Sequence, residues 1–101
     1  MRFLMKVSMP IEAGNAAAKN GFKALQDILG EIKPEAAYFY AEGGMRTGIL
    51  IVNMSDASQI PALAEPFFLA MNASVEICPV MLPEDLAKAG PAIEAAVKKY
   101  S

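Results

Sequence analysis

The sequence predicts an α+β fold with the element order β-α-β-β-α-β and a four-stranded antiparallel sheet. Alternating apolar and polar residues indicate four strands, and apolar residues three or four positions apart indicate two helices. A Gly-Gly pair between the two middle strands indicates a hairpin. Because right-handed crossovers place both helices of this order on the same side, one face of the sheet is expected to lack helices.

The first strand and the first helix are predicted from their apolar spacing. Residues Arg2 to Met9 alternate and predict a half-buried strand, which Pro10 ends. A single helix is expected from about Ile11 to Gly30, with Gly30 near its end and Pro34 shortly after it as stop signals. The apolar stripe of this helix comprises Ala18, Phe22, Leu25 and Leu29.

The two middle strands are predicted on either side of Gly43-Gly44. Residues Glu35 to Glu42 alternate around aromatic side chains, which favour extended structure. Residues Arg46 to Met54 have a nearly continuous apolar centre, which indicates a central strand covered on both faces.

The second helix and the last strand have clear boundary signals. Asp56 is a suitable N-cap, with Gln59 as its capping-box partner, and Asn72 is a suitable left-handed C-cap. The buried stripe of the helix comprises Ile60, Leu63, Ala64, Phe67 and Met71. Ser74 to Met81 is then predicted as a strand, and Pro79 favours an edge position because it cannot donate to a neighbour.

The remaining residues, 83–101, are predicted as a helical tail with two short pieces joined at Gly90-Pro91. No repeat, linker or low-complexity stretch divides the chain. We therefore expect one domain over residues 1–101, with a core of residues 2–82.

Composition excludes several classes of partner. A net charge of −2 without a basic block argues against nucleic acid, and no apolar run reaches the length of a membrane span. The N-terminus lacks the pattern of a signal peptide, and the lone Cys78 cannot form an intrachain disulfide. The expected location is cytoplasmic.

The absence of His and Trp limits the available chemistry. It excludes a Ser-His-acid triad, a zinc site that uses His and haem ligation by His, and no metal or other cofactor is expected. Gly43 to Gly48 has half of a phosphate-loop spacing, but Ile49 and Leu50 replace the required Lys and Ser or Thr. We expect Cys78 to be a small buried hydrophobe rather than a thiol activated by Lys6.

The sheet face without helices is expected to be apolar. It would display Leu4, Tyr38, Tyr40, Ile49, Ile51 and Val80. An uncovered apolar face of this kind favours a homodimer that packs sheet to sheet. The alternative is a monomer whose C-terminal tail folds across the sheet.

Residues 2–82 have the element order of the dimeric α/β-barrel superfamily, whose members are ferredoxin-like domains. The segment Asn72-Ala-Ser-Val-Glu-Ile-Cys-Pro-Val80, after a helix that contains Phe-Phe, resembles the ending of small bacterial families that are mostly uncharacterised. The resemblance implies a small cleft between two protomers. The superfamily includes cofactor-independent monooxygenases, lactone isomerases and haem-degrading enzymes, but the Asn-Trp-His set of the haem-degrading members is missing here.

Polar residues predicted on the open face form the candidate ligand-binding site. They are Lys6, Ser8, Tyr38, Tyr40, Asn53 and Glu76. They either line a pocket for a small apolar or aromatic metabolite, or they form a Lys6–Glu76 ion pair beside interface tyrosines. The alternative function is a cofactor-independent monooxygenase or isomerase, in which Tyr38 or Tyr40 orients a substrate and Lys6 or Glu76 moves a proton. The sequence identifies no catalytic residue, because a Lys6–Glu76 pair would move both pKa values away from neutrality.

Overall fold

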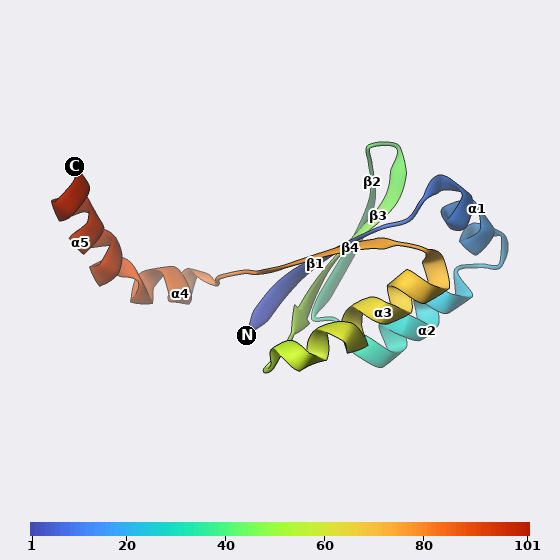
Figure 1. Ribbon diagram of the computed structural model, residues 1–101, viewed down its shortest axis with the longest axis horizontal. Coiled ribbons are helices and arrows are strands. Elements are labelled where there is room, and N and C mark those ends of the chain that lie inside the picture. Colours follow the sequence, from blue (N-terminus) through green and yellow to red (C-terminus); the bar gives the residue numbers. More distant parts are fainter.

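The computed structural model describes residues 1–101 and confirms the predicted fold, a ferredoxin-like antiparallel sheet with helices. The strand order is β2-β3-β1-β4 (Figure 1). The elements are β1 (Arg2–Ser8), α1 (Ile11–Lys19), α2 (Lys23–Ile32), β2 (Ala36–Glu42), β3 (Met45–Asn53), the 3₁₀ turn η1 (Ala57–Gln59), α3 (Ile60–Met71), β4 (Ser74–Pro79), α4 (Pro83–Lys88) and α5 (Gly90–Tyr100).

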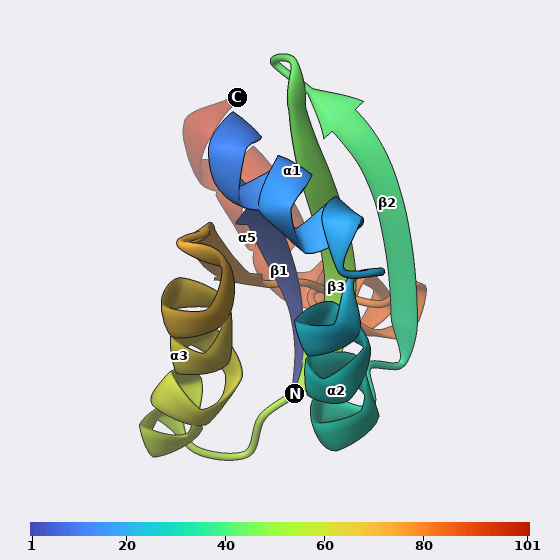
Figure 2. The ribbon, with the colours of Figure 1, turned by 90° about the vertical axis from the view of Figure 1, so that its right-hand side faces the viewer.

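The core lies between the sheet and the helices α1, α2 and α3, which cover one face of the sheet (Figure 2). Its largest fully buried side chains are Phe67 of α3, Met5 of β1 and Leu50 of β3. In β3, Leu50 and Val52 are buried, whereas the alternate residues Ile49 and Ile51 are only half-buried. The predicted central position of β3 is confirmed, since it lies between β2 and β1, but the helices of this chain cover only one of its faces.

The single helix expected from Ile11 to Gly30 is two helices. Asn20 ends α1, and then Gly21 and Phe22 both adopt left-handed backbone with φ of 73° and 56°. The amides of Gly21 and Phe22 donate to the carbonyls of Ala18 and Ala17, which closes α1 in the manner of a Schellman cap. The apolar spacing continues across the break, so the spacing alone could not reveal it.

The second helix of this pair also extends further than predicted. Gly30 lies inside α2 and ends nothing, because Lys33 takes the left-handed terminal position with φ 45° and donates its amide to Leu29. Pro34 then follows in the connection to β2.

Turn and cap predictions are confirmed at three places. Gly43 and Gly44 have φ of 60° and 78°, as a type I′ hairpin requires. Asp56 accepts from the amide of Ser58 at 2.8 Å, while Gln59 accepts from the amide of Asp56 at 3.1 Å. Asn72 ends α3 in the left-handed region with φ 52°. The residue types at these positions therefore determine where the hairpin and the two helix ends form.

The C-terminal segment, residues 83–101, forms an arm of α4 and α5 that extends away from the sheet (Figure 1). Figures 1 and 2 place the arm and the three covering helices on opposite sides of the sheet. All residues of α4 are exposed, as are the residues of α5 from Pro91 onward. The arm therefore does not cover the open face. None of the helices combines the length and the apolar character that a membrane-spanning helix needs.

Candidate functional site

The six predicted site residues all belong to strands, and the register places them on the open face. Lys6 of β1 pairs with Glu76 of β4 and with Ile49 of β3, and Ile49 in turn pairs with Tyr38 of β2. The next row toward the hairpin contains Ser74, Ser8, Thr47 and Tyr40. Asn53 lies at the opposite end of the face, where it pairs with Arg2. The six candidate residues are therefore not one cluster: Asn53 lies apart, and the other five lie in two neighbouring rows toward the hairpin.

A polar cluster forms at the hairpin end around Glu42, which the sequence analysis did not select. The ammonium of Lys6 forms ion pairs with Glu42 and, at 3.8 Å, with Glu76. The hydroxyl of Tyr40 donates to Glu42 at 2.5 Å. The predicted Lys6–Glu76 pair is thus confirmed, but Glu42 is the closer partner. The sequence did contain a signal for Glu42. It lies two residues after Tyr40 in β2, and alternate residues of a strand lie on the same face of the sheet.

The contacts in this cluster move three pKa values away from neutrality. The hydrogen bond from Lys6 lowers the pKa of the Glu42 carboxyl, and the bond from Tyr40 adds to the effect. The bond with Glu42 raises the pKa of Lys6 and, separately, that of the Tyr40 hydroxyl. At neutral pH the cluster holds a carboxylate, an ammonium and a neutral phenol, so none of the three is poised as a general base.

The cluster makes stability depend on pH at acidic values. Because the pKa of Glu42 is lower in the folded protein than its ordinary value of 4.5, its contribution is complete above that value and is lost as the pH falls through the folded value. As the pH falls from about 5 to about 2, we expect the free energy of unfolding, measured in urea, to fall less for Glu42→Gln than for the natural chain. Glu65→Gln, on the exposed side of α3, should keep the natural acid dependence. Equal acid sensitivity of the Glu42→Gln variant and the natural chain would contradict this account.

Two further residues of the open face, Tyr38 and Cys78, are exposed. Tyr38 is 69% exposed, and Cys78, which pairs with Leu4, is also exposed. The expectation that Cys78 is a buried hydrophobe is therefore wrong. Cys78 alternates with Val75 and Ile77 on β4, and this places it on the face that no helix covers.

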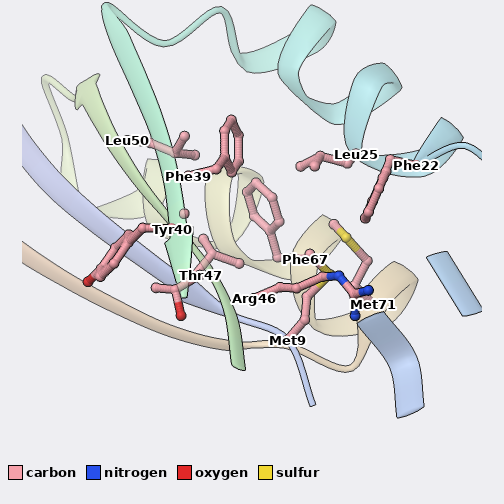
Figure 3. Close-up of a pocket in the computed structure, with 12 residues that line it drawn as sticks. Met9, Phe22, Leu25, Phe39, Tyr40, Arg46, Thr47, Leu50, Phe67 and Met71 are labelled. Atoms are coloured by element: carbon pink, nitrogen blue, oxygen red, sulfur yellow. The ribbon is translucent and has the colours of Figure 1, made fainter. Parts of the chain in front are cut away.

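A cavity of about 420 Å³ lies on the other side of the sheet, between the strands and the helices (Figure 3). Nine of its twelve lining residues are hydrophobic. The lining comprises Val7, Met9, Phe22, Leu25, Phe39, Tyr40, Arg46, Thr47, Gly48, Leu50, Phe67 and Met71. Figure 3 shows the Tyr40 ring turned away from the other lining side chains, consistent with its place in the open-face cluster. The cavity is thus apolar except near Arg46 and the backbone of the hairpin strands.

Two local features shape this cavity. Gly48 pairs with Phe39 across the β2–β3 ladder, and a Cβ at position 48 would lie 2.9 Å from the Phe39 ring. The glycine therefore leaves room for the aromatic ring over the strand. At the other side, the break between α1 and α2 brings Phe22 to the lining in a left-handed conformation that bulky residues rarely adopt. Strained backbone of this kind concentrates at functional sites.

Comparison with known families identifies the chain's relatives. A family model described as "Domain of unknown function (DUF3303)" matches residues 1–94. The chain belongs to the DUF3303 family. The match covers the whole sheet, its three covering helices and part of the arm, so the DUF3303 domain includes both the open face and the cavity. No curated protein matches the chain.

The DUF3303 description names no activity. Sequence reasoning assigned Phe22, Leu25, Phe67 and Met71 to the buried helix stripes and did not recognise them as the lining of a cavity. One signal was available in β3: Arg46 and Gly48 share the face of the buried residue Leu50, and neither a charge nor a glycine is the usual choice there.

Proposed function

We propose that this DUF3303 protein binds a small apolar or aromatic metabolite in the cavity between its sheet and its helices. The observation that supports the proposal is the cavity itself. Its volume of about 420 Å³ lies within the ~300–1,000 Å³ typical of ligand sites, and its lining is predominantly aliphatic and aromatic. Two phenylalanine rings contribute from opposite layers, Phe39 from β2 and Phe67 from α3.

The cavity is partly open to solvent, and its floor is formed by buried side chains such as Leu50 and Phe67, each 1% exposed. Nearer the opening, Phe39 is 53% exposed, so apolar surface of the lining is in contact with water. Contact of apolar surface with water is unfavourable. A ligand that fills the cavity would remove this surface from water, and an apolar ligand suits the lining.

We further propose that the protein is a homodimer whose open sheet faces pack together. The face carries the apolar residues Leu4, Ile49 and Ile51 beside Tyr38, and none of the chain's helices covers it. In such a dimer the six candidate ligand-binding residues, Lys6, Ser8, Tyr38, Tyr40, Asn53 and Glu76, would line the interface between the protomers. A cleft at this interface is the alternative binding site for the metabolite. The helix-side cavity would stay accessible, because it lies on the other side of the sheet.

The arm supports the dimer proposal. Its apolar stripe, Leu86, Ile93, Val97 and Tyr100, is exposed along its full length. Because the arm extends on the side of the open face, a second copy that packs on this face would meet the arm as well. Contact with a second copy would therefore remove two uncovered apolar surfaces together.

The enzymatic alternative has less support. A monooxygenase or isomerase mechanism on the open face would use Lys6 or Glu76 for proton transfer and a tyrosine to orient substrate. Lys6 is instead held by Glu42, and its pKa is raised. Binding without chemistry requires only the cavity, so we favour it.

Binding of the neutral fluorescent probe N-phenyl-1-naphthylamine tests the proposed site. We expect probe fluorescence to rise on addition of the protein, and Leu25→Trp to weaken probe binding by about tenfold or more, because the larger side chain occupies the cavity. Leu69→Trp is the matched control, since Leu69 is 83% exposed on α3 and does not line this cavity.

Two results would contradict the proposed site. If the natural chain does not bind the probe, the cavity is not a binding site for apolar molecules. If Tyr38→Ala weakens binding while Leu25→Trp does not, the probe occupies the open-face cleft and the proposed location is wrong.

A further inference from the structure

Arg46 is the only charged residue among those that line the cavity. It is the second residue of β3 and shares the helix side of the strand with Gly48 and Leu50. Its side chain reaches α1, where Nη1 donates to Asn15 Oδ1 at 2.9 Å. A Cβ on Gly14 would lie 2.9 Å from the same Nη1, so this glycine allows the guanidinium to rest against the helix. Arg46 is exposed, so it lies where the cavity opens to solvent, and its contacts with Gly14 and Asn15 hold it against α1.

The positive charge of Arg46 has no acidic partner. The ion pairs of the chain join Arg2 to Glu35, Lys6 to Glu42 and Glu76, and Lys98 to Glu94. The one side-chain partner of Arg46 is the neutral amide of Asn15. A guanidinium has five N–H donors, so most of its donors and its whole charge remain for another group. Figure 3 shows the guanidinium on the same side of the cavity as Met9 and Met71.

We propose that the ligand of the cavity is a monocarboxylate with an aromatic or aliphatic body. This inference rests on the proposed function and specifies its ligand class. The carboxylate pairs with the free edge of Arg46 in a bidentate arrangement, and the body lies among Phe39, Leu25 and Phe67. One exposed cation at the opening of an apolar cavity fits a ligand with one charged end, since a second charge on the body of the ligand would enter the apolar part without a partner.

A purely structural role for Arg46 makes a different prediction. In that case the arginine serves to hold α1 against β3 through Asn15, and the charge itself has no ligand. Loss of Asn15 would then have the same consequence as loss of Arg46. If the charge recognises a carboxylate, the two substitutions separate, because Asn15→Ala leaves the guanidinium in place.

The test compares an acid with its matched alcohol. 4-Phenylbutyrate and 4-phenyl-1-butanol differ at the terminal group only, and each is titrated against protein that holds N-phenyl-1-naphthylamine. At neutral pH we expect the acid to displace the probe at a concentration about tenfold lower than the alcohol, because a charge-assisted pair replaces a neutral contact. Arg46→Gln should abolish this preference while probe affinity stays within about twofold.

The controls separate charge from position. Lys23→Gln removes an equivalent charge from an exposed site at the start of α2 that does not line the cavity, and it should keep the acid preference. Asn15→Ala should keep it as well. If Asn15→Ala and Arg46→Gln change the two displacement curves in the same way, the carboxylate inference is overturned in favour of the structural role.

The outcomes also separate this inference from the function on which it rests. If the natural chain does not bind N-phenyl-1-naphthylamine, the cavity proposal itself fails. If the probe binds but acid and alcohol displace it equally from the natural chain, the cavity proposal stands and the carboxylate inference is overturned. This comparison uses the natural chain, so it decides the matter even if Arg46→Gln does not fold.

Discussion

Phe67→Ala is expected to lower the free energy of unfolding by about 3–5 kcal/mol. Phe67 is 1% exposed and lies in α3 against the sheet, where it also borders the cavity. Truncation removes the ring from the core and leaves a space in its place, so the transfer free energy of the ring is lost and the cost of the new space is added. For a chain of this size the melting temperature should fall by at least about 12 °C.

The neighbouring residue is a matched control for this prediction. Phe68 is 41% exposed on the same helix, and Phe68→Ala should cost about 1 kcal/mol or less. Urea unfolding of both variants at one protein concentration measures the two costs, since a dimer makes apparent stability depend on concentration. Similar costs for the two substitutions would show that α3 does not pack on the sheet through Phe67.

Ile51→Lys is expected to convert the proposed homodimer into a monomer. Ile51 is half-buried on the open face, where it pairs with Leu4 and Ala36. In a two-fold interface the substitution occurs twice, and each new ammonium would have to leave water for an apolar surface. We expect the dissociation constant of the dimer to rise by about a hundredfold or more.

Sedimentation velocity over a range of micromolar concentrations measures this change. Leu69→Lys introduces the same charge on the exposed side of α3 and should leave the dimer intact. Circular dichroism should show both variants folded, because neither side chain belongs to the buried core. A natural chain that sediments as a monomer throughout would remove the dimer from the account.

Most of the fold could be predicted because short-range patterns determine it. The alternation from Arg2 to Met9 predicted a half-buried strand, in which Met5 and Val7 are buried, and the Gly43-Gly44 pair located the hairpin. The break between α1 and α2 could not be predicted, since Phe22 adopts a backbone conformation that its side chain disfavours. Lys33 is a similar case, because a lysine takes the left-handed position for which Gly30 was the obvious candidate.

The sequence predicted the candidate residues of the open face but not the cavity on the helix side of the sheet, and the reason is physical. A period of two assigns Lys6, Tyr38 and Glu76 to one side of the sheet, and the structure agrees. The cavity depends instead on how two layers pack, and in particular on the register that sets Phe39 across from Gly48. Register and interlayer packing involve residues distant in sequence, so a local pattern does not contain them.

The natural methionines offer the most direct test of the central claim, that the cavity between sheet and helices is the ligand site. Met9 and Met71 line the cavity, whereas Met1 and Met81 are exposed and lie elsewhere. Methyl NMR spectra recorded during titration with N-phenyl-1-naphthylamine should show the largest shifts at Met9 and Met71, because the aromatic rings of the probe would lie beside their methyl groups. Shifts that are largest at Met45, on the open-face side of the hairpin, or no shift at any methionine, would contradict the account.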